Sequence, residues 1–97
     1  MYDLAWEAEG VVWVCEVKSL TPNNEEKQLR LGLGQVLRYQ EQLSCIVSPS
    51  RVVRAVLAVE RHPSDESWHV LCRRLNVSLV CGPDYTLDGG LAWSGID

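Results

Sequence analysis

A carboxylate and a lysine close an apolar run near the start of the chain. The run covers residues 11–18, and six of its eight residues are Val, Trp or Cys, which predicts a strand. Because side chains of a strand alternate between its two faces, Glu16 and Lys18 would be neighbours on one face. A carboxylate there can bind a metal ion, and an ammonium group beside it can polarise an attacking water and stabilise developing negative charge. The pair therefore favours metal-assisted chemistry.

Asp3 would add a second carboxylate if residues 2–7 form a strand that pairs with residues 11–18. A two-residue turn at Glu9-Gly10 would pair residues whose numbers add up to 19, which sets Asp3 opposite Glu16. Opposed carboxylates repel each other and need a cation between them. Mg²⁺ fits because it is typically held by one or two carboxylates and keeps several waters. A one-residue slip of this register would instead send Asp3 to the other face.

A long helix is expected after this hairpin. Asn23, followed three residues later by Glu26, is a capping-box variant that would begin it. A stripe at three- and four-residue spacing adjoins its apolar face, consisting of Gln28, Gly32, Gln35 and Tyr39. Gly32 and Gly34 each cost about 1 kcal/mol relative to Ala in a helix interior. This cost indicates close approach of the helix to the sheet or to a ligand backbone, or a plain packing role.

The remaining sequence predicts two strands and a short helix. Residues 52–59 are almost continuously apolar, as in a central parallel strand covered on both faces. Ser64 or Asp65 would cap a short helix that ends near Asn76, and residues 77–81 would form the last strand. The helix has four apolar residues at helical spacing: Trp68, Leu71, Cys72 and Leu75. The predicted fold is α/β, with a mixed sheet built from an antiparallel hairpin and βαβαβ crossovers.

These elements resemble the PD-(D/E)XK nuclease superfamily, which has the restriction-endonuclease-like fold. The motifs that carry the resemblance are Tyr2-Asp3, Glu16-Val17-Lys18 and Gln35-Val36-Leu37-Arg38-Tyr39. The last of them looks like the Gln-x-x-x-Tyr motif of the RecB-like and exonuclease-like branches. The resemblance covers roughly residues 2–81, and the usual first helix and strand of the family core are lacking. It implies a nuclease core over residues 1–83 and a tail over residues 84–97.

The resemblance also implies a role for each motif residue. Asp3, Glu16 and the backbone carbonyl of Val17 would bind Mg²⁺, with Mn²⁺ as a substitute, and Lys18 would assist the water nucleophile. The helix glutamine and tyrosine, Gln35 and Tyr39, would support the site and the nucleic-acid backbone. The chain would then be a metal-dependent hydrolase that cuts phosphodiester bonds, with DNA as the expected substrate.

Two other readings of the same residues stay open. In the first, the chain keeps the nuclease fold but is catalytically inactive and binds nucleic acid or protein. In the second, it is an unrelated small α/β domain with incidental charges. The lacking front elements and the strand expected at residues 2–7 also favour a homodimer, or a domain of a larger parent protein.

Charge and composition narrow the expected partners. The net charge of −4 over 97 residues argues against a protein that grips nucleic acid with its whole surface. Contacts to phosphate are expected instead from Lys27, Arg30 and Arg38 on the long helix, with Arg51 and Arg54 near the next strand. No signal peptide or membrane-length apolar stretch is seen, so a soluble, cytoplasmic protein without membrane contact is expected.

The cysteines and histidines show no metal-binding pattern along the sequence. The four cysteines have no Cys-x-x-Cys spacing, which favours buried thiols over a zinc site or a disulfide framework. His62 precedes a proline in an expected loop, and His69 lies beside Trp68 on the short helix. Solvent exposure is the expectation for both histidines.

Overall fold

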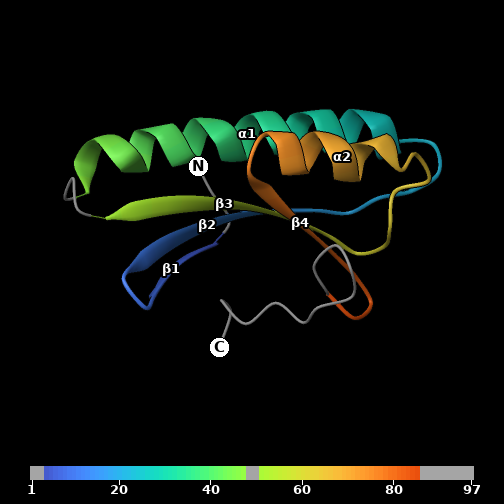
Figure 1. Ribbon diagram of the computed structural model, residues 1–97. Coiled ribbons are helices and arrows are strands. Elements are labelled where there is room, and N and C mark those ends of the chain that lie inside the picture. The colour runs from blue at the N-terminus through green and yellow to red at the C-terminus, as the bar shows by residue number, and fades with distance from the viewer. Residues whose placement is uncertain (1–3, 48–50, 86–97) are drawn as a thin grey trace.

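The computed structural model describes residues 4–47 and 51–85, which form one sheet and two helices (Figure 1). The elements are β1 (Leu4–Ala8), β2 (Val11–Lys18), α1 (Glu25–Ile46), β3 (Val52–Val59), α2 (Ser67–Arg74) and β4 (Val77–Cys81). The strands lie in the order β1-β2-β3-β4; β1 is antiparallel to β2, and the other neighbours are parallel. The predicted α/β class, the mixed sheet and the order of elements are confirmed.

The β1–β2 hairpin has the predicted turn and register. Glu9 and Gly10 both have positive φ, 52° and 81°, as a type I′ turn requires. Leu4 pairs with Cys15, so the numbers of paired residues add up to 19 as predicted. Asp3 lies outside the described residues, and its place opposite Glu16 stays a prediction.

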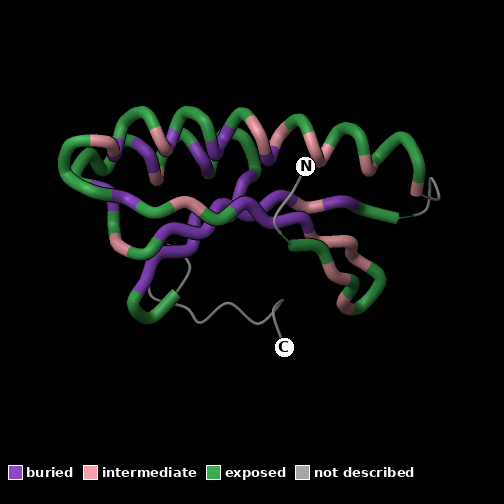
Figure 2. The backbone as a smooth tube through the Cα atoms, turned by 180° about the vertical axis from the view of Figure 1, so that it is seen from behind, coloured by how far each residue is buried: buried purple, intermediate pink, exposed green. Residues whose placement is uncertain are grey.

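Both helices cover the same face of the sheet, as Figures 1 and 2 show from opposite sides. α1 packs on β2 and β3, and α2 packs on β4. The main core between the layers includes Val14 of β2, Leu29 and Val36 of α1, Leu57 of β3 and Trp68 of α2. β3 is nearly buried along its length, which confirms that it is the central strand.

The opposite face of the sheet carries a smaller apolar cluster. Cys15, Val56, Ala58 and Val80 are buried there. The rings of Trp6 and Trp13 pack against them and stack on each other, with centroids 6.2 Å apart. Of the two described helices, neither covers this face (Figure 1). Within the described ranges, no helix is both long and apolar enough to cross a membrane.

The helix starts differ from those predicted. Asn24, not Asn23, precedes α1, and its side-chain oxygen accepts a hydrogen bond from the Thr21 backbone N–H at 2.7 Å. The predicted capping box is therefore wrong, because that side chain closes the preceding turn. Glu66 precedes α2, and the Asp65 carboxylate accepts a bond from the Ser67 N–H at 2.9 Å.

The predicted end of α2 is confirmed, but only two of the four apolar residues at helical spacing are buried. Asn76 follows the helix with φ of 58°, a left-handed conformation that asparagine tolerates and that ends helices. Trp68 and Cys72 are buried, whereas Leu71 and Leu75 are 39% and 42% exposed. An eight-residue helix that meets only β4 turns one narrow stripe to the sheet, so its flanking leucines stay outside.

Only one of the two helical glycines lies against a neighbour. A Cβ atom on Gly32 would be 2.7 Å from Leu57 Cδ1 and 2.9 Å from Lys18 Cγ, both closer than carbon atoms can pack. A Cβ atom on Gly34 would meet no atom within 4 Å. The expected close approach of helix and sheet is therefore confirmed at Gly32 and wrong at Gly34.

The two glycines should respond oppositely to the same substitution. Gly34→Ala should raise the free energy of unfolding by up to about 1 kcal/mol, because alanine favours the helix and nothing obstructs its methyl group. Gly32→Ala should lower it by about 1–3 kcal/mol, because the buried Leu57 and the Lys18 stem must move. Urea unfolding of both variants measures the difference. Equal effects at the two positions would contradict this account of the α1–β2 contact.

Candidate functional site

Glu16 and Lys18 form an ion pair between the sheet and α1. Both side chains point to the helix-covered face of β2, the face on which Val14 joins the main core. Lys18 Nζ lies 3.6 Å from Glu16 Oε2, and the two side chains are 19% and 4% exposed. The prediction that the two residues are neighbours on one face is confirmed. The carboxylate lies deep and the ammonium group lies nearer the solvent.

α1 carries the predicted glutamine past the strand that holds this pair. The helix runs back against β2 (Figure 1), and Gly32 lies over the Lys18 side chain. Gln35 follows three residues later, about 4.5 Å along the helix, while Glu16 lies about 6.6 Å back along the strand from Lys18. Gln35 is therefore on the flank of α1 that passes Glu16. Its side-chain oxygen is buried, and no donor among the described residues reaches it.

Tyr39 lies one further turn along the same flank. It is half-buried and packs against the main core. A shallow groove of about 320 Å³ joins it to Gln35 and to two of the predicted phosphate contacts, Arg30 and Arg38. The structure thus brings the Gln-x-x-x-Tyr motif and two arginines to one surface.

The predicted basic residues do not all belong to this groove. Lys27 is exposed on α1 and does not line it. Arg30 forms an exposed ion pair with Glu26, at 2.7 Å between Nε and Oε2, so part of its charge is already neutralised. Arg51 pairs with Glu7 across the sheet, from the start of β3 to β1. Arg38 is also exposed and lines the groove beside the motif residues.

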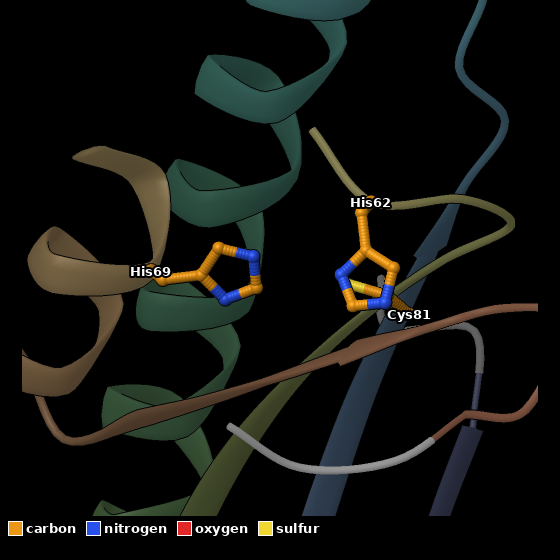
Figure 3. A group of neighbouring side chains, drawn as sticks. All are labelled: His62, His69 and Cys81. Carbon is orange, nitrogen blue, oxygen red and sulfur yellow. The ribbon is translucent and has the colours of Figure 1, made fainter. Parts of the chain in front are cut away.

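A second group of chemically capable side chains lies at the β4 edge of the sheet, at the same strand ends as Lys18 (Figure 3). His62 comes from the loop after β3, His69 from α2 and Cys81 from the last position of β4. One ligand atom of each lies within 4.8 Å of the others. His62 and His69 point toward one another, with ring centroids 5.7 Å apart, and the Cys81 sulfur lies beside His62. These three residues are called the His-His-Cys cluster below.

The sequence did not predict this cluster. His62 is exposed as expected, but His69 is half-buried, so that expectation was wrong. Cys15, Cys72 and Cys81 are buried as expected, while Cys45 is exposed. One feature of the sequence could have indicated the cluster. Cys81 ends one parallel strand and Val59 ends its neighbour, and His62 follows Val59 by three residues.

The start of α2, which carries His69, is held by a carboxylate. Asp65 Oδ1 accepts hydrogen bonds from the Ser67 hydroxyl at 2.7 Å and from the Ser67 N–H at 2.9 Å. These bonds favour the ionised form, and they lower the pKa of Asp65 below its ordinary value of 3.8, with the hydroxyl bond as the larger cause.

Removing this carboxylate should weaken the protein only where the carboxylate is ionised. Because the pKa is lowered by folding, the contribution of Asp65 is fully present above about pH 3.8 and disappears as the pH falls through the lower folded value. Asp65→Ala should therefore lower the thermal midpoint at pH 6 and have progressively less effect below pH 3.8. Thermal unfolding of wild type and variant across pH measures this. An undiminished difference in acid would contradict the assignment.

Comparisons with protein-family models, curated proteins and solved structures found no match for this chain. The α/β architecture alone does not fix an activity, because the same folds serve many functions. What the chain does has to follow from its own residues and their geometry.

Proposed function

We propose that the chain is a Mg²⁺-dependent nuclease of the restriction-endonuclease-like fold that hydrolyses phosphodiester bonds in DNA. The observation that carries the proposal is the Glu16–Lys18 pair, with 3.6 Å between Oε2 and Nζ under α1. The hairpin with its register, and the helix with Gln35 and Tyr39 after it, follow one another along the chain in the order that the family resemblance implies.

The cost of this ion pair supports a functional role. Taking two charges out of water is expensive, and a well-packed apolar pair is often equally or more stable. The surrounding face of β2 and β3 is apolar, with Val14 and Leu57 fully buried, so apolar residues would suit these two positions. The sequence keeps a carboxylate and an amine there, and Gly32 admits the lysine stem at the cost of helix propensity.

Each residue has a task that its position supports. The Glu16 carboxylate supplies hard oxygen ligands of the type that Mg²⁺ takes, with Asp3 and the Val17 carbonyl as the further proposed ligands. When bound, Mg²⁺ would activate a water and neutralise charge on the phosphate. Lys18 donates toward the developing negative charge from the more exposed end of the pair. Gln35 would support these groups from α1, where its buried side-chain oxygen can accept a hydrogen bond.

The groove on α1 supports a nucleic-acid backbone as the substrate. Arg30 and Arg38 line it together with Gln35 and Tyr39. Arginine binds phosphate through a planar set of donors. Binding limited to this groove is compatible with a net charge of −4, since the described residues that line it include no carboxylate and Glu26 reaches only Arg30 among the lining arginines.

Cleavage should depend on both members of the buried pair. Glu16→Gln and Lys18→Met should each lower Mg²⁺-dependent cleavage of DNA by about 100-fold or more, because each removes a group that acts on charge in the transition state. Single-turnover assays on single- and double-stranded DNA, with circular dichroism to verify folding, measure the loss. Glu41→Gln, an exposed carboxylate elsewhere on α1, is the matched control and should cleave like wild type. Folded Glu16 and Lys18 variants that both cut at the wild-type rate would overturn the proposal.

A second candidate function is a module of the same fold that binds nucleic acid without cutting it. The burial of Glu16, whose side chain is 4% exposed, favours this candidate because a metal ligand must reach both ion and substrate. DNA binding by wild type without turnover in Mg²⁺ or Mn²⁺ would select this second function over the first.

Both functions place phosphate against the α1 groove, which salt dependence can test. Arg38→Ala should weaken DNA binding and reduce the slope of log affinity against log salt concentration by about 0.7–0.9, the loss of one phosphate contact. Arg73→Ala, on α2, is the control and should leave the slope unchanged. Fluorescence anisotropy over a salt series measures both. An unchanged slope for Arg38→Ala would remove the groove from the binding surface.

A further inference from the structure

We propose that the His-His-Cys cluster of His62, His69 and Cys81 is a zinc site. The cluster lies outside the groups used in the proposed nuclease and combines three side chains from a loop, a helix and a strand end (Figure 3). Two imidazoles and a thiol form a donor set typical of Zn²⁺ and unlike the oxygen set of Mg²⁺.

The distances in the cluster are close to those that zinc requires. The three ligand atoms lie within 4.8 Å of one another. Tetrahedral bonds of about 2.0–2.1 Å to nitrogen and 2.3 Å to sulfur separate ligand atoms by about 3.3–3.6 Å. The largest separation allowed by this limit exceeds the tetrahedral value by about 1.2–1.5 Å, a difference that small side-chain rotations of the ligands can close.

The backbone holds the two inner ligands in place. Cys81 is 1% exposed and pairs in register with Val59, whose carbonyl also accepts the Gly82 N–H at 2.7 Å. His69 follows the buried Trp68, whose indole N–H donates to Glu26 Oε1 at 3.3 Å. These contacts fix a strand end and a helix face before any ion binds, as a preorganised site requires.

The loop that carries His62 is anchored on both sides of the histidine. Just before it, Glu60 accepts a bond from the Leu20 N–H at 2.9 Å, and Arg61 pairs with Glu25 at 3.0 Å. Just after it, Pro63 is buried and the Ser64 N–H donates to Glu25 at 2.7 Å. His62 is thus an exposed side chain on a fixed backbone, so an ion can enter from solvent on its side.

Three protein ligands leave one position of a four-coordinate zinc for water or another small ligand. This count is typical of zinc sites that bind and activate water, whereas structural sites use four protein ligands. The bound ion would also join the β3–α2 loop, α2 and β4, and so stabilise the last third of the described fold.

Zinc binding by purified full-length protein tests the proposal, with competition against a chromophoric chelator as the readout. Wild type should bind one Zn²⁺ per chain, and His62→Ala and His69→Ala should each weaken binding at least tenfold. Zn²⁺ should raise the thermal midpoint of wild type but not of His62→Ala. Two variants should bind like wild type: Cys45→Ser, which removes an exposed thiol, and Glu16→Gln, which alters only the proposed Mg²⁺ site.

Cobalt identifies the sulfur ligand directly. Co²⁺-loaded wild type should show a thiolate charge-transfer band in the near ultraviolet and intense visible bands of tetrahedral coordination. Cys81→Ser should lose the charge-transfer band. His62→Ala covers the case in which Cys81→Ser fails to fold, because His62 is exposed. No zinc binding by wild type, binding lost in Cys45→Ser, or wild-type affinity in both histidine variants would each overturn the proposal. None of these readouts depends on DNA cleavage.

Discussion

The parallel pairing of β3 with both β2 and β4 sets the place of every candidate group. β3 is hydrogen-bonded to a neighbour on each edge, and most of its residues up to Val59 are buried. A change of register between these three strands would therefore break backbone hydrogen bonds and expose core residues. Its register sets Lys18, Val59 and Cys81 in one row across the sheet. Two interstrand spacings, about 10 Å, therefore separate the Lys18 and Cys81 backbones. Both side chains lie on the helix-covered face, near the carboxyl ends of parallel strands, where open α/β sheets bind their ligands.

Local sequence patterns predicted the helices and strands and the Glu16–Lys18 pair. Val, Trp and Cys in residues 11–18 and the apolar run in residues 52–59 were enough to identify β2 and β3, because strand burial depends on the residues of the strand itself. The Glu9-Gly10 turn fixed the hairpin register, since both residues take left-handed backbone conformations. Period-two alternation then placed Glu16 beside Lys18. Each of these inferences needed only neighbouring residues.

What the sequence did not reveal depends on contacts between distant segments. In the turn before α1, the Asn24 side chain accepts the Thr21 N–H. The neighbouring Leu20 N–H donates to Glu60, which belongs to a loop much later in the chain. Leu71 stays partly outside because β4 is the one described strand that α2 packs on. His62, His69 and Cys81 come together only when the β3–α2–β4 crossover has folded. Seen separately, each had an ordinary local explanation, and no spacing along the chain could distinguish the cluster from three unrelated residues.

The two proposed metal sites are chemically separated as well as spatially. Glu16 offers carboxylate oxygens, which suit a hard ion that keeps its waters, while the cluster offers nitrogen and sulfur, which Mg²⁺ does not favour. The buried Glu25 accepts bonds from Arg61 and Ser64 and ties the loop of the cluster to the start of α1. The same helix carries Gln35 and Tyr39 along its groove. One helix therefore supports both proposed sites, and their different donor sets keep the two ions from competing for the same ligands.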